Sequence, residues 1–136
     1  MDELSKSSDI AVSGMKVQAQ RLRVISENLA NVDSLPRTPD EQPYRRKVIS
    51  FKAQLDRAND MNLVTVDRVR TDKSQFNRKY DPTHPASDRE GYVLTPNVNP
   101  LIELMDMREA QRSYEANLAV ITSSRQLLSR TIEMLR

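Results

Sequence analysis

Cysteine is absent from this chain of 136 residues, so disulfides and thiolate metal sites are excluded. Tryptophan is absent as well, and only 4% of the residues are aromatic, which is few for a compact core of this size. No run of about 18 apolar residues occurs, so we expect no direct membrane span. Together these absences favour an elongated molecule, or one that completes its core with neighbouring chains.

A large excess of charge of one sign is also missing. The net charge is only +2, and acidic and basic side chains nearly balance in each part of the chain. A phosphate backbone requires a basic stripe, so we expect no nucleic-acid partner. The first residues, MDELSKSSD, lack the basic-then-apolar pattern of a cleaved signal peptide.

Glycine and proline divide the chain. Only two glycines occur, and all seven prolines lie between residues 36 and 100. Because proline breaks helices and glycine weakens them, the two ends are free to be helical and the middle is not. We therefore expect an N-terminal helical segment at 1–34, a small β-rich or loop region at 35–96 and a C-terminal helical segment at 97–136.

The N-terminal segment predicts a helix from about Ser8 to Val32, with Ser8 or Asp9 as its cap. Apolar residues recur there at steps of three and four, and Gln18 fills one polar place. Asn28 and Asn31 are expected to close this helix, because asparagine tolerates a helix terminus, and the pair could also face a packed neighbour. The apolar stripe consists of Ala11, Met15, Leu22, Ile25, Leu29 and Val32.

The C-terminal segment predicts a helix that begins near Asn97 or Asn99, carries Pro100 in its first turn and reaches Arg136. Such a helix is roughly 50–60 Å long and needs a partner along its length. Its stripe consists of Leu104, Met107, Gln111, Tyr114, Leu118, Ile121, Arg125, Leu128, Ile132 and Leu135. Gln18, Gln111 and Arg125 interrupt the two stripes, either as an imperfect, partly wet seam or as residues that fix the register.

Strand-like composition marks the middle, around Tyr44–Phe51, at 63–69 and at 92–94, while 54–61 could instead be a short helix. We predict a mainly α fold, in which long N- and C-terminal helices pair as an antiparallel coiled coil around a small β-rich or irregular insertion.

Residues that could carry catalysis are few. His84 is the only histidine, and no nucleophile motif, phosphate loop or zinc pattern accompanies it. We expect no cofactor, no metal and no small-molecule substrate. The basic cluster Arg45, Arg46 and Lys47 indicates either contact with a neighbour in an assembly or a charged strand edge that discourages aggregation.

Four segments resemble the family of bacterial flagellar rod and hook proteins. They are SGMKVQAQRLRVISENLANVDS, PYRRKVISF with YDPTHPASDREGYVLTPNVNP, and the C-terminal LIELMDMREAQRSYEANLAVITSSRQLLSRTIEML. Ser34 and a proline-rich loop stand where hook and distal rod proteins carry a Thr-x-Gly-Tyr-Lys pattern, so the resemblance points to the short proximal rod type. The motif residues are Ser13, Gly14, Asn28, Asn31, Tyr44, Arg45, Arg46, Lys47, Tyr80, Asp81, Pro82, Gly91, Tyr92, Pro96, Asn97 and Asn99.

The resemblance implies a structural, non-enzymatic subunit of the basal-body rod, the drive shaft that crosses the periplasm and transmits torque for motility. It further implies export through the flagellar export apparatus, and a helical array made of copies of this chain and other rod proteins. The expected assembly seam consists of Met15, Leu22, Ile25, Leu29, Val32, Leu104, Met107, Tyr114, Leu118, Ile121, Leu128, Ile132 and Leu135. The alternatives are a cytoplasmic coiled-coil adaptor or export chaperone, a small enzyme and a nucleic-acid binder.

Overall fold

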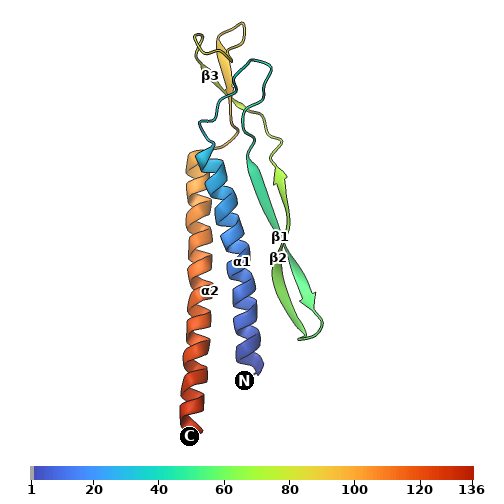
Figure 1. Cartoon of the computed structure of the whole chain (residues 1–136), viewed down its shortest axis with the longest axis vertical. Helices are drawn as coiled ribbons and strands as arrows, with labels where there is room; N and C mark the ends of the chain where they lie inside the picture. The colour runs from blue at the N-terminus through green and yellow to red at the C-terminus, as the bar shows by residue number, and fades with distance from the viewer. Residues whose placement is uncertain (1) are drawn as a thin grey trace. The chain divides into compact units, whose positions relative to one another are not determined.

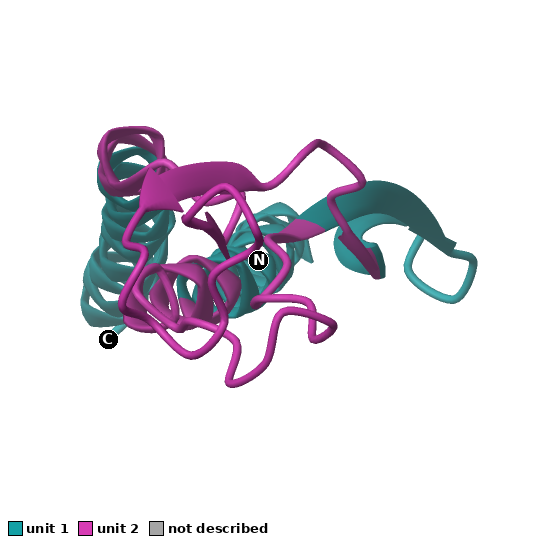
Figure 2. Cartoon of the chain, turned by 90° about the horizontal axis from the view of Figure 1, so that it is seen from above, with its two compact units in different colours: residues 1–22, 49–68, 107–136 teal, residues 23–48, 69–106 magenta. Residues whose placement is uncertain are grey.

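A computed structural model describes residues 2–136 as two helices and four strands, in the order α1, β1, β2, β3, β4, α2 (Figure 1). Met1, where the expected first segment begins, lies outside the described residues. The chain divides into two compact units (Figure 2). Unit 1 comprises residues 1–22, 49–68 and 107–136, and unit 2 comprises residues 23–48 and 69–106.

Helix α1 (Asp2–Ala30) begins earlier than expected. Asp2 and Glu3 occupy its first turn, where carboxylates interact favourably with the positive end of the helix dipole. Ser8 and Asp9 are therefore helical residues, and the prediction that they cap the helix is wrong. At the other end, the Asn31 side chain donates to the carbonyl of Glu27 at 2.8 Å, which satisfies one of the last free carbonyls of the helix.

Helix α2 (Pro100–Met134) begins as the sequence predicts. The Asn99 side chain accepts the amide of Leu101 at 3.1 Å, and its carbonyl accepts the amide of Glu103 at 3.1 Å. Asn99 is thus the cap, and Pro100 stands where an amide hydrogen is not needed. Within residues 2–136, neither helix is long and apolar enough to cross a membrane.

In unit 1 the two helices pack antiparallel. Gly14 of α1 lies against Asn117 of α2, so closely that an added Cβ would come 2.7 Å from Asn117 Nδ2. About two turns further along α1, Arg21 forms an ion pair with Glu109 at 3.3 Å. The residues that this unit buries are mostly small or of medium size: Ala11, Val17, Met61, Ala110, Ile121 and Ser124.

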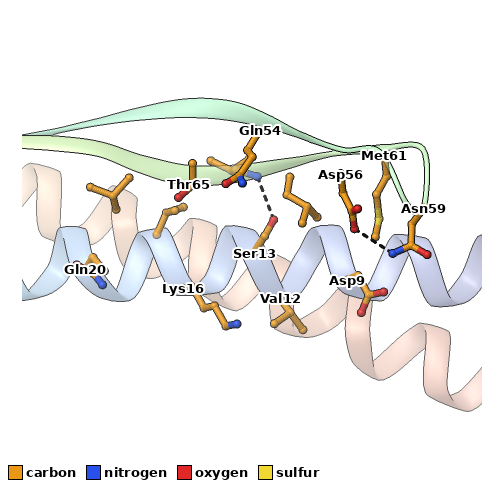
Figure 3. A pocket seen from close by; sticks show the side chains of 14 residues that line it. Asp9, Val12, Ser13, Lys16, Gln20, Gln54, Asp56, Asn59, Met61 and Thr65 are labelled. Carbon is orange, nitrogen blue, oxygen red and sulfur yellow. Dashed lines mark hydrogen bonds between the residues drawn. The ribbon is translucent and has the colours of Figure 1, made fainter.

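A long hairpin is formed by β1 (Lys47–Asp56) and β2 (Met61–Thr71), and its residues 49–68 supply the rest of unit 1. Asp56 accepts hydrogen bonds from the Ala58 amide and the Asn59 side chain in its turn, so 54–61 is a strand end and a turn, not a short helix. The hydroxyl of Ser13 on α1 accepts the amide of Val64 on β2 at 3.2 Å (Figure 3). This bond joins the hairpin to α1.

Unit 2 contains the short hairpin of β3 (Asn77–Tyr80) and β4 (Tyr92–Thr95), paired antiparallel from Asn77 opposite Thr95 to Tyr80 opposite Tyr92. Its two tyrosine rings meet edge to face with centroids 5.3 Å apart. Val93 on the opposite face of β4 is fully buried. The His84 ring accepts the amide of Ala86 at 3.0 Å in the loop between the strands.

The predicted fold class is wrong. A pair of helices is present, but 47% of the chain is helical and 21% is strand, in two small antiparallel sheets, so the protein is not a mainly α coiled coil. The β1–β2 hairpin accounts for most of the difference, because its strands are 10 and 11 residues long where short strands were expected. Much of this hairpin is exposed, so only a weak apolar alternation marks it in the sequence.

Gly91 gives a direct test of this fold. Its φ of +88° is unfavourable for residues with a Cβ, and an added Cβ would lie 3.0 Å from the Tyr80 ring and 3.1 Å from Pro82 Cβ. We expect Gly91→Ala to lower the free energy of unfolding by about 1–2 kcal/mol. Urea unfolding measures this, with the exposed neighbour Arg89→Ala as the control. Equal stability of both variants would contradict the left-handed turn.

Candidate functional site

The side chain of Asn28 is the centre of a buried polar cluster in unit 2. It is only 1% exposed. Its amide pairs with the backbone of Lys47 in both directions: Nδ2 donates to the carbonyl at 2.9 Å, and Oδ1 accepts the amide at 2.9 Å. Oδ1 also accepts the Tyr44 hydroxyl at 2.8 Å, and Nδ2 also donates to Glu103 at 3.3 Å. Asn28 therefore joins the end of α1 to the beginning of β1 and to the first turn of α2.

Glu103 and Arg46 form the charged part of this cluster. Glu103 is 1% exposed, and its Oε1 accepts a hydrogen bond from Arg46 Nε. The Arg46 guanidinium also lies 3.5 Å from Asp72 Oδ2 and 3.7 Å from Asp106 Oδ2. A buried carboxylate is costly unless it is paired and hydrogen-bonded, and both conditions are met here. We call Asn28, Tyr44, Arg46, Asp72 and Glu103 the polar junction.

The three residues of the basic cluster, Arg45, Arg46 and Lys47, each contact other residues of unit 2. Arg45 donates to the carbonyls of Asp72 and Ser74 and lies 4.2 Å above the Phe76 ring. Lys47 forms an ion pair with Glu27 at 3.1 Å. The Arg46 amide donates to the Asn97 side chain at 2.7 Å. All three side chains thus have partners within unit 2, which neither interpretation of the cluster foresaw.

Burial and charge shift two pKa values in the junction. Burial raises the pKa of the Tyr44 hydroxyl, and the nearby carboxylates of Glu27 and Glu103 raise it further. For Arg46, burial alone acts to lower the pKa, but hydrogen bonds and attraction to Glu103 and Asp72 outweigh it, and the net shift is upward. Both groups keep their ordinary protonation states near neutral pH.

The expected assembly seam lies partly inside and partly outside the packed surfaces. On α1, Ile25 is buried, whereas Met15, Leu22 and Leu29 are half-buried; Val32 is half-buried just beyond the helix. On α2, Ile121 is buried, and Met107, Tyr114 and Leu128 are half-buried. The side chains of the remaining members are about half exposed or more in the single chain: Leu104, Leu118, Ile132 and Leu135.

Small residues, rather than the apolar stripe, line the pairing surface of α2 in unit 1. Ala110 and Ser124 are buried and Asn117 contacts Gly14, whereas Gln111, Leu118 and Arg125, each one residue later, are exposed. One residue rotates a helix by about 100°, so the larger side chains point to the side of the α1–α2 contact. Arg125 therefore has no desolvation cost within the chain. On α1, Gln18 Oε1 is buried with no hydrogen-bond donor among residues 2–136.

The other motif residues have local structural roles. Ser13 donates to the carbonyl of Ile10 at 2.7 Å while it accepts the Val64 amide. The Asn31 side chain accepts the Ser34 hydroxyl. The remaining motif residues close turns and cap elements in unit 2. The Asp81 amide donates to the Gly91 carbonyl, the Asn77 side chain donates to the Pro96 carbonyl, and the Asn97 side chain donates to Ser74. Tyr80 contacts the Tyr92 ring, and Tyr80 and Pro82 lie close to Gly91.

Sequence reasoning missed Glu103, Asp72 and Asp106. Each lies far along the chain from Arg46, so no local spacing connects them. The available signal for Glu103 was a carboxylate within the otherwise apolar run Leu101–Met105, where a charged residue needs a partner if it is buried. Among the described residues, no group of three or more metal-ligating side chains could hold a metal ion.

Known proteins with similar sequences are flagellar. Residues 9–34 match the model of the family "Flagella basal body rod protein", and residues 89–134 match "Flagellar basal body rod FlgEFG protein C-terminal". A relative from Agrobacterium fabrum, "Flagellar basal-body rod protein FlgC", is 49% identical and covers 100% of this chain and 98% of its own length. FlgC proteins of Borreliella burgdorferi (39% identical, 98% of both chains) and Bacillus subtilis (35% identical, 94% of this chain and 95% of its own) are also similar.

The two matched family models define the class as flagellar basal-body rod proteins. Full-length relatives above 30% identity then narrow the class, and the chain belongs to the FlgC family. The resemblance that the sequence carried is confirmed.

The polar junction predicts a large difference between two identical substitutions on α2. Glu103→Gln removes a buried negative charge from Arg46, and we expect it to lower the free energy of unfolding by roughly 3 kcal/mol. Glu109→Gln removes an exposed partner of Arg21, and we expect a change below about 1 kcal/mol. Urea unfolding of both variants measures the difference. Similar losses in the free energy of unfolding would mean that the buried ion pair of the junction stabilises the protein no more than an exposed one.

Asp72 predicts a dependence on pH. The Ser74 amide, above all, and also the Ser74 side chain and Arg46 hold the pKa of this carboxyl below its ordinary value. A lowered pKa means that its contribution to stability is present above about pH 4 and is lost as the pH falls through the folded-state pKa. The stability gap between the natural chain and Asp72→Asn should therefore be present at pH 7 and shrink below pH 4, as urea unfolding across pH measures.

Asp40→Asn, at an exposed position outside the junction, is the matched control and should stay close to the natural chain at every pH. A gap for Asp72→Asn that is constant from pH 7 down to pH 2 would contradict the assigned role of this carboxylate.

Proposed function

We propose that this chain is a non-enzymatic structural subunit of the flagellar basal-body rod, assembled through its terminal helices. The full-length similarity to proteins named as basal-body rod FlgC supports the role. The proposal includes a position in the periplasmic, proximal part of the rod, and assembly with other rod proteins and with further copies of this chain. It also includes export through the flagellar export apparatus without a cleaved signal peptide.

The observation that carries the mode of assembly is the exposure of α2. Its pairing surface in unit 1 uses small residues, and its large apolar side chains are left in solvent: Leu101, Ile102, Leu104, Met105, Leu118, Val120, Leu127, Ile132 and Met134. A helix that is apolar on several sides is typical of the interior of a bundle. Burial of one such side chain contributes roughly 1.5–3 kcal/mol, so neighbours that cover α2 would gain considerable stability.

In this proposal the terminal segments 1–34 and 97–136 act as the inner helical domain of the rod, and 35–96 is the smaller outer part. The seam residues of α2 become buried only in the assembly, where many lateral contacts transmit torque. A weak core in the single chain suits a protein that has to pass the export apparatus in an unfolded state. The polar junction would then give unit 2 its fixed structure after export.

Leu118→Asp tests this function. The side chain is 46% exposed in the single chain, so we expect folding and expression to remain intact. In the rod a buried, unpaired carboxylate is strongly unfavourable, and we expect loss of rods and of swimming in soft agar. Gln126→Asp, also at an exposed position of α2, is the control and should leave both intact.

Electron microscopy and immunoblots of purified basal bodies give the readout. Normal rods that contain the Leu118→Asp chain would contradict assembly through α2. The absence of the natural chain from basal bodies, with the chain found in the cytoplasm instead, would contradict the rod function itself and favour the adaptor or export chaperone.

A further inference from the structure

The loop between β3 and β4, residues 81–91, is closed by bonds of two kinds. At its ends, the backbone amide of Asp81 donates to the carbonyl of Gly91 at 2.9 Å. Within the loop, the side chains of His84 and Asp88 accept backbone amides. Since both side chains can gain a proton, the bonds that they accept depend on pH.

The His84 side chain organises the first half of the loop. Its Nδ1 accepts the amide of Ala86, two residues further along the chain, at 3.0 Å. The His84 backbone adds two more bonds, because its amide donates to the Asp81 carbonyl at 3.2 Å and its carbonyl accepts the Ser87 amide at 3.0 Å. Ala86 is only 4% exposed, so little water can replace the ring as an acceptor for its amide.

The bond to Ala86 requires a neutral ring. An imidazole accepts a hydrogen bond at Nδ1 only while its single proton is on Nε2. When the ring gains a second proton, both nitrogens are donors, and an N–H of His84 then faces the N–H of Ala86. Histidine ordinarily changes its charge between about pH 5 and pH 8. The bond is therefore present at the upper end of this range and is lost as the pH falls.

The charged groups near this half of the loop do not compensate for a protonated ring. The Asp81 carboxylate accepts the Thr83 hydroxyl at 2.9 Å. Lys79 on β3 and Arg89 in the loop are exposed cations, which cannot stabilise a further positive charge. His84 forms no ion pair among residues 2–136. Proton uptake therefore removes a bond without supplying another in this arrangement.

The second half of the loop depends on Asp88 and responds to pH in a different range. Its Oδ1 accepts the amides of Glu90 and Tyr92, each at 2.9 Å, and its Oδ2 lies 3.4 Å from Arg78, which also pairs with Glu90. The Tyr92 amide, above all, and also the Glu90 amide and Arg78 hold the pKa of the Asp88 carboxyl below its ordinary value. This carboxylate therefore keeps its bonds at about pH 5, where histidine is ordinarily protonated.

We propose that His84 is a pH-sensitive switch in the β3–β4 loop, in which proton uptake by the ring opens residues 81–87 while residues 88–92 stay in place. Pro82, Thr83 and Pro85 are exposed, so opening this segment changes an exposed surface of unit 2. The inference does not depend on the proposed rod function, because it concerns a bond within the single chain.

Hydrogen exchange of the purified chain, followed by nuclear magnetic resonance, tests the switch. The exchange rate of the Ala86 amide, divided by the rate of an unfolded peptide at the same pH, reports whether this amide keeps its acceptor. We expect this ratio to be about tenfold higher at about pH 5 than at about pH 7.5. The Glu90 and Tyr92 amides, which Asp88 accepts, are internal controls, and their ratios should stay the same.

Two substitutions separate the acceptor from its charge. Asparagine places an oxygen where His84 has Nδ1 and does not titrate, so His84→Asn should protect the Ala86 amide equally at both pH values. His84→Ala has no acceptor and should leave this amide unprotected at both.

Three results would overturn the proposal. One is equal protection of the Ala86 amide at both pH values in the natural chain, and another is no protection at either. The third is a loss of protection on acidification that persists in His84→Asn, because the proton would then act through another group.

Discussion

The ion pair between Arg46 and Glu103 is the interaction on which unit 2 depends. Three segments that are distant in the sequence meet at it: the end of α1, the residues before β1 and the first turn of α2. A carboxylate that is only 1% exposed has lost nearly all of its hydration, so it is tolerable only when its partners are all in place. This requirement gives unit 2 a specific structure from hydrogen bonds and charge, in a chain that has few large apolar residues to bury.

In unit 1, the small and the large side chains of the helices have different surroundings. The contact between α1 and α2 in unit 1 uses Gly14, Ala110, Asn117 and Ser124, and leaves most large aliphatic side chains of α2 in solvent. Small residues let two helices approach closely but contribute little apolar area. The single chain therefore gains its order from close approach and polar bonds, and the apolar area of the exposed α2 side chains is not used within it.

Local signals made part of this structure predictable. Asn99 and Pro100 marked the beginning of α2 correctly, because a cap and a first-turn proline act through their nearest neighbours. The prediction that Ser8 or Asp9 caps α1 was wrong, because both residues are good caps by type but lie inside the helix. The apolar period of α2 follows Gln111, Leu118 and Arg125, which lie one residue, or about 100°, away from the surface that packs on α1, because apolar spacing does not show which side of a helix faces its partner. The β1–β2 hairpin and the pairing of Arg46 with Glu103 depend on contacts between distant residues, which periodicity does not record.

The way in which Asn28 binds Lys47 has a consequence for how this family can vary. Asn28 contacts the amide and the carbonyl of residue 47, as a neighbouring strand would, and makes no use of the lysine side chain. Any residue with a backbone amide can satisfy this arrangement at position 47. At position 28 the requirement is strict, because aspartate lacks the donor and glutamine places the amide one methylene too far. The contact with Asn28 therefore sets no requirement on the side chain at position 47, whose only described partner is Glu27, while position 28 admits a single amino acid, because Asn28 is the partner that contributes its side chain.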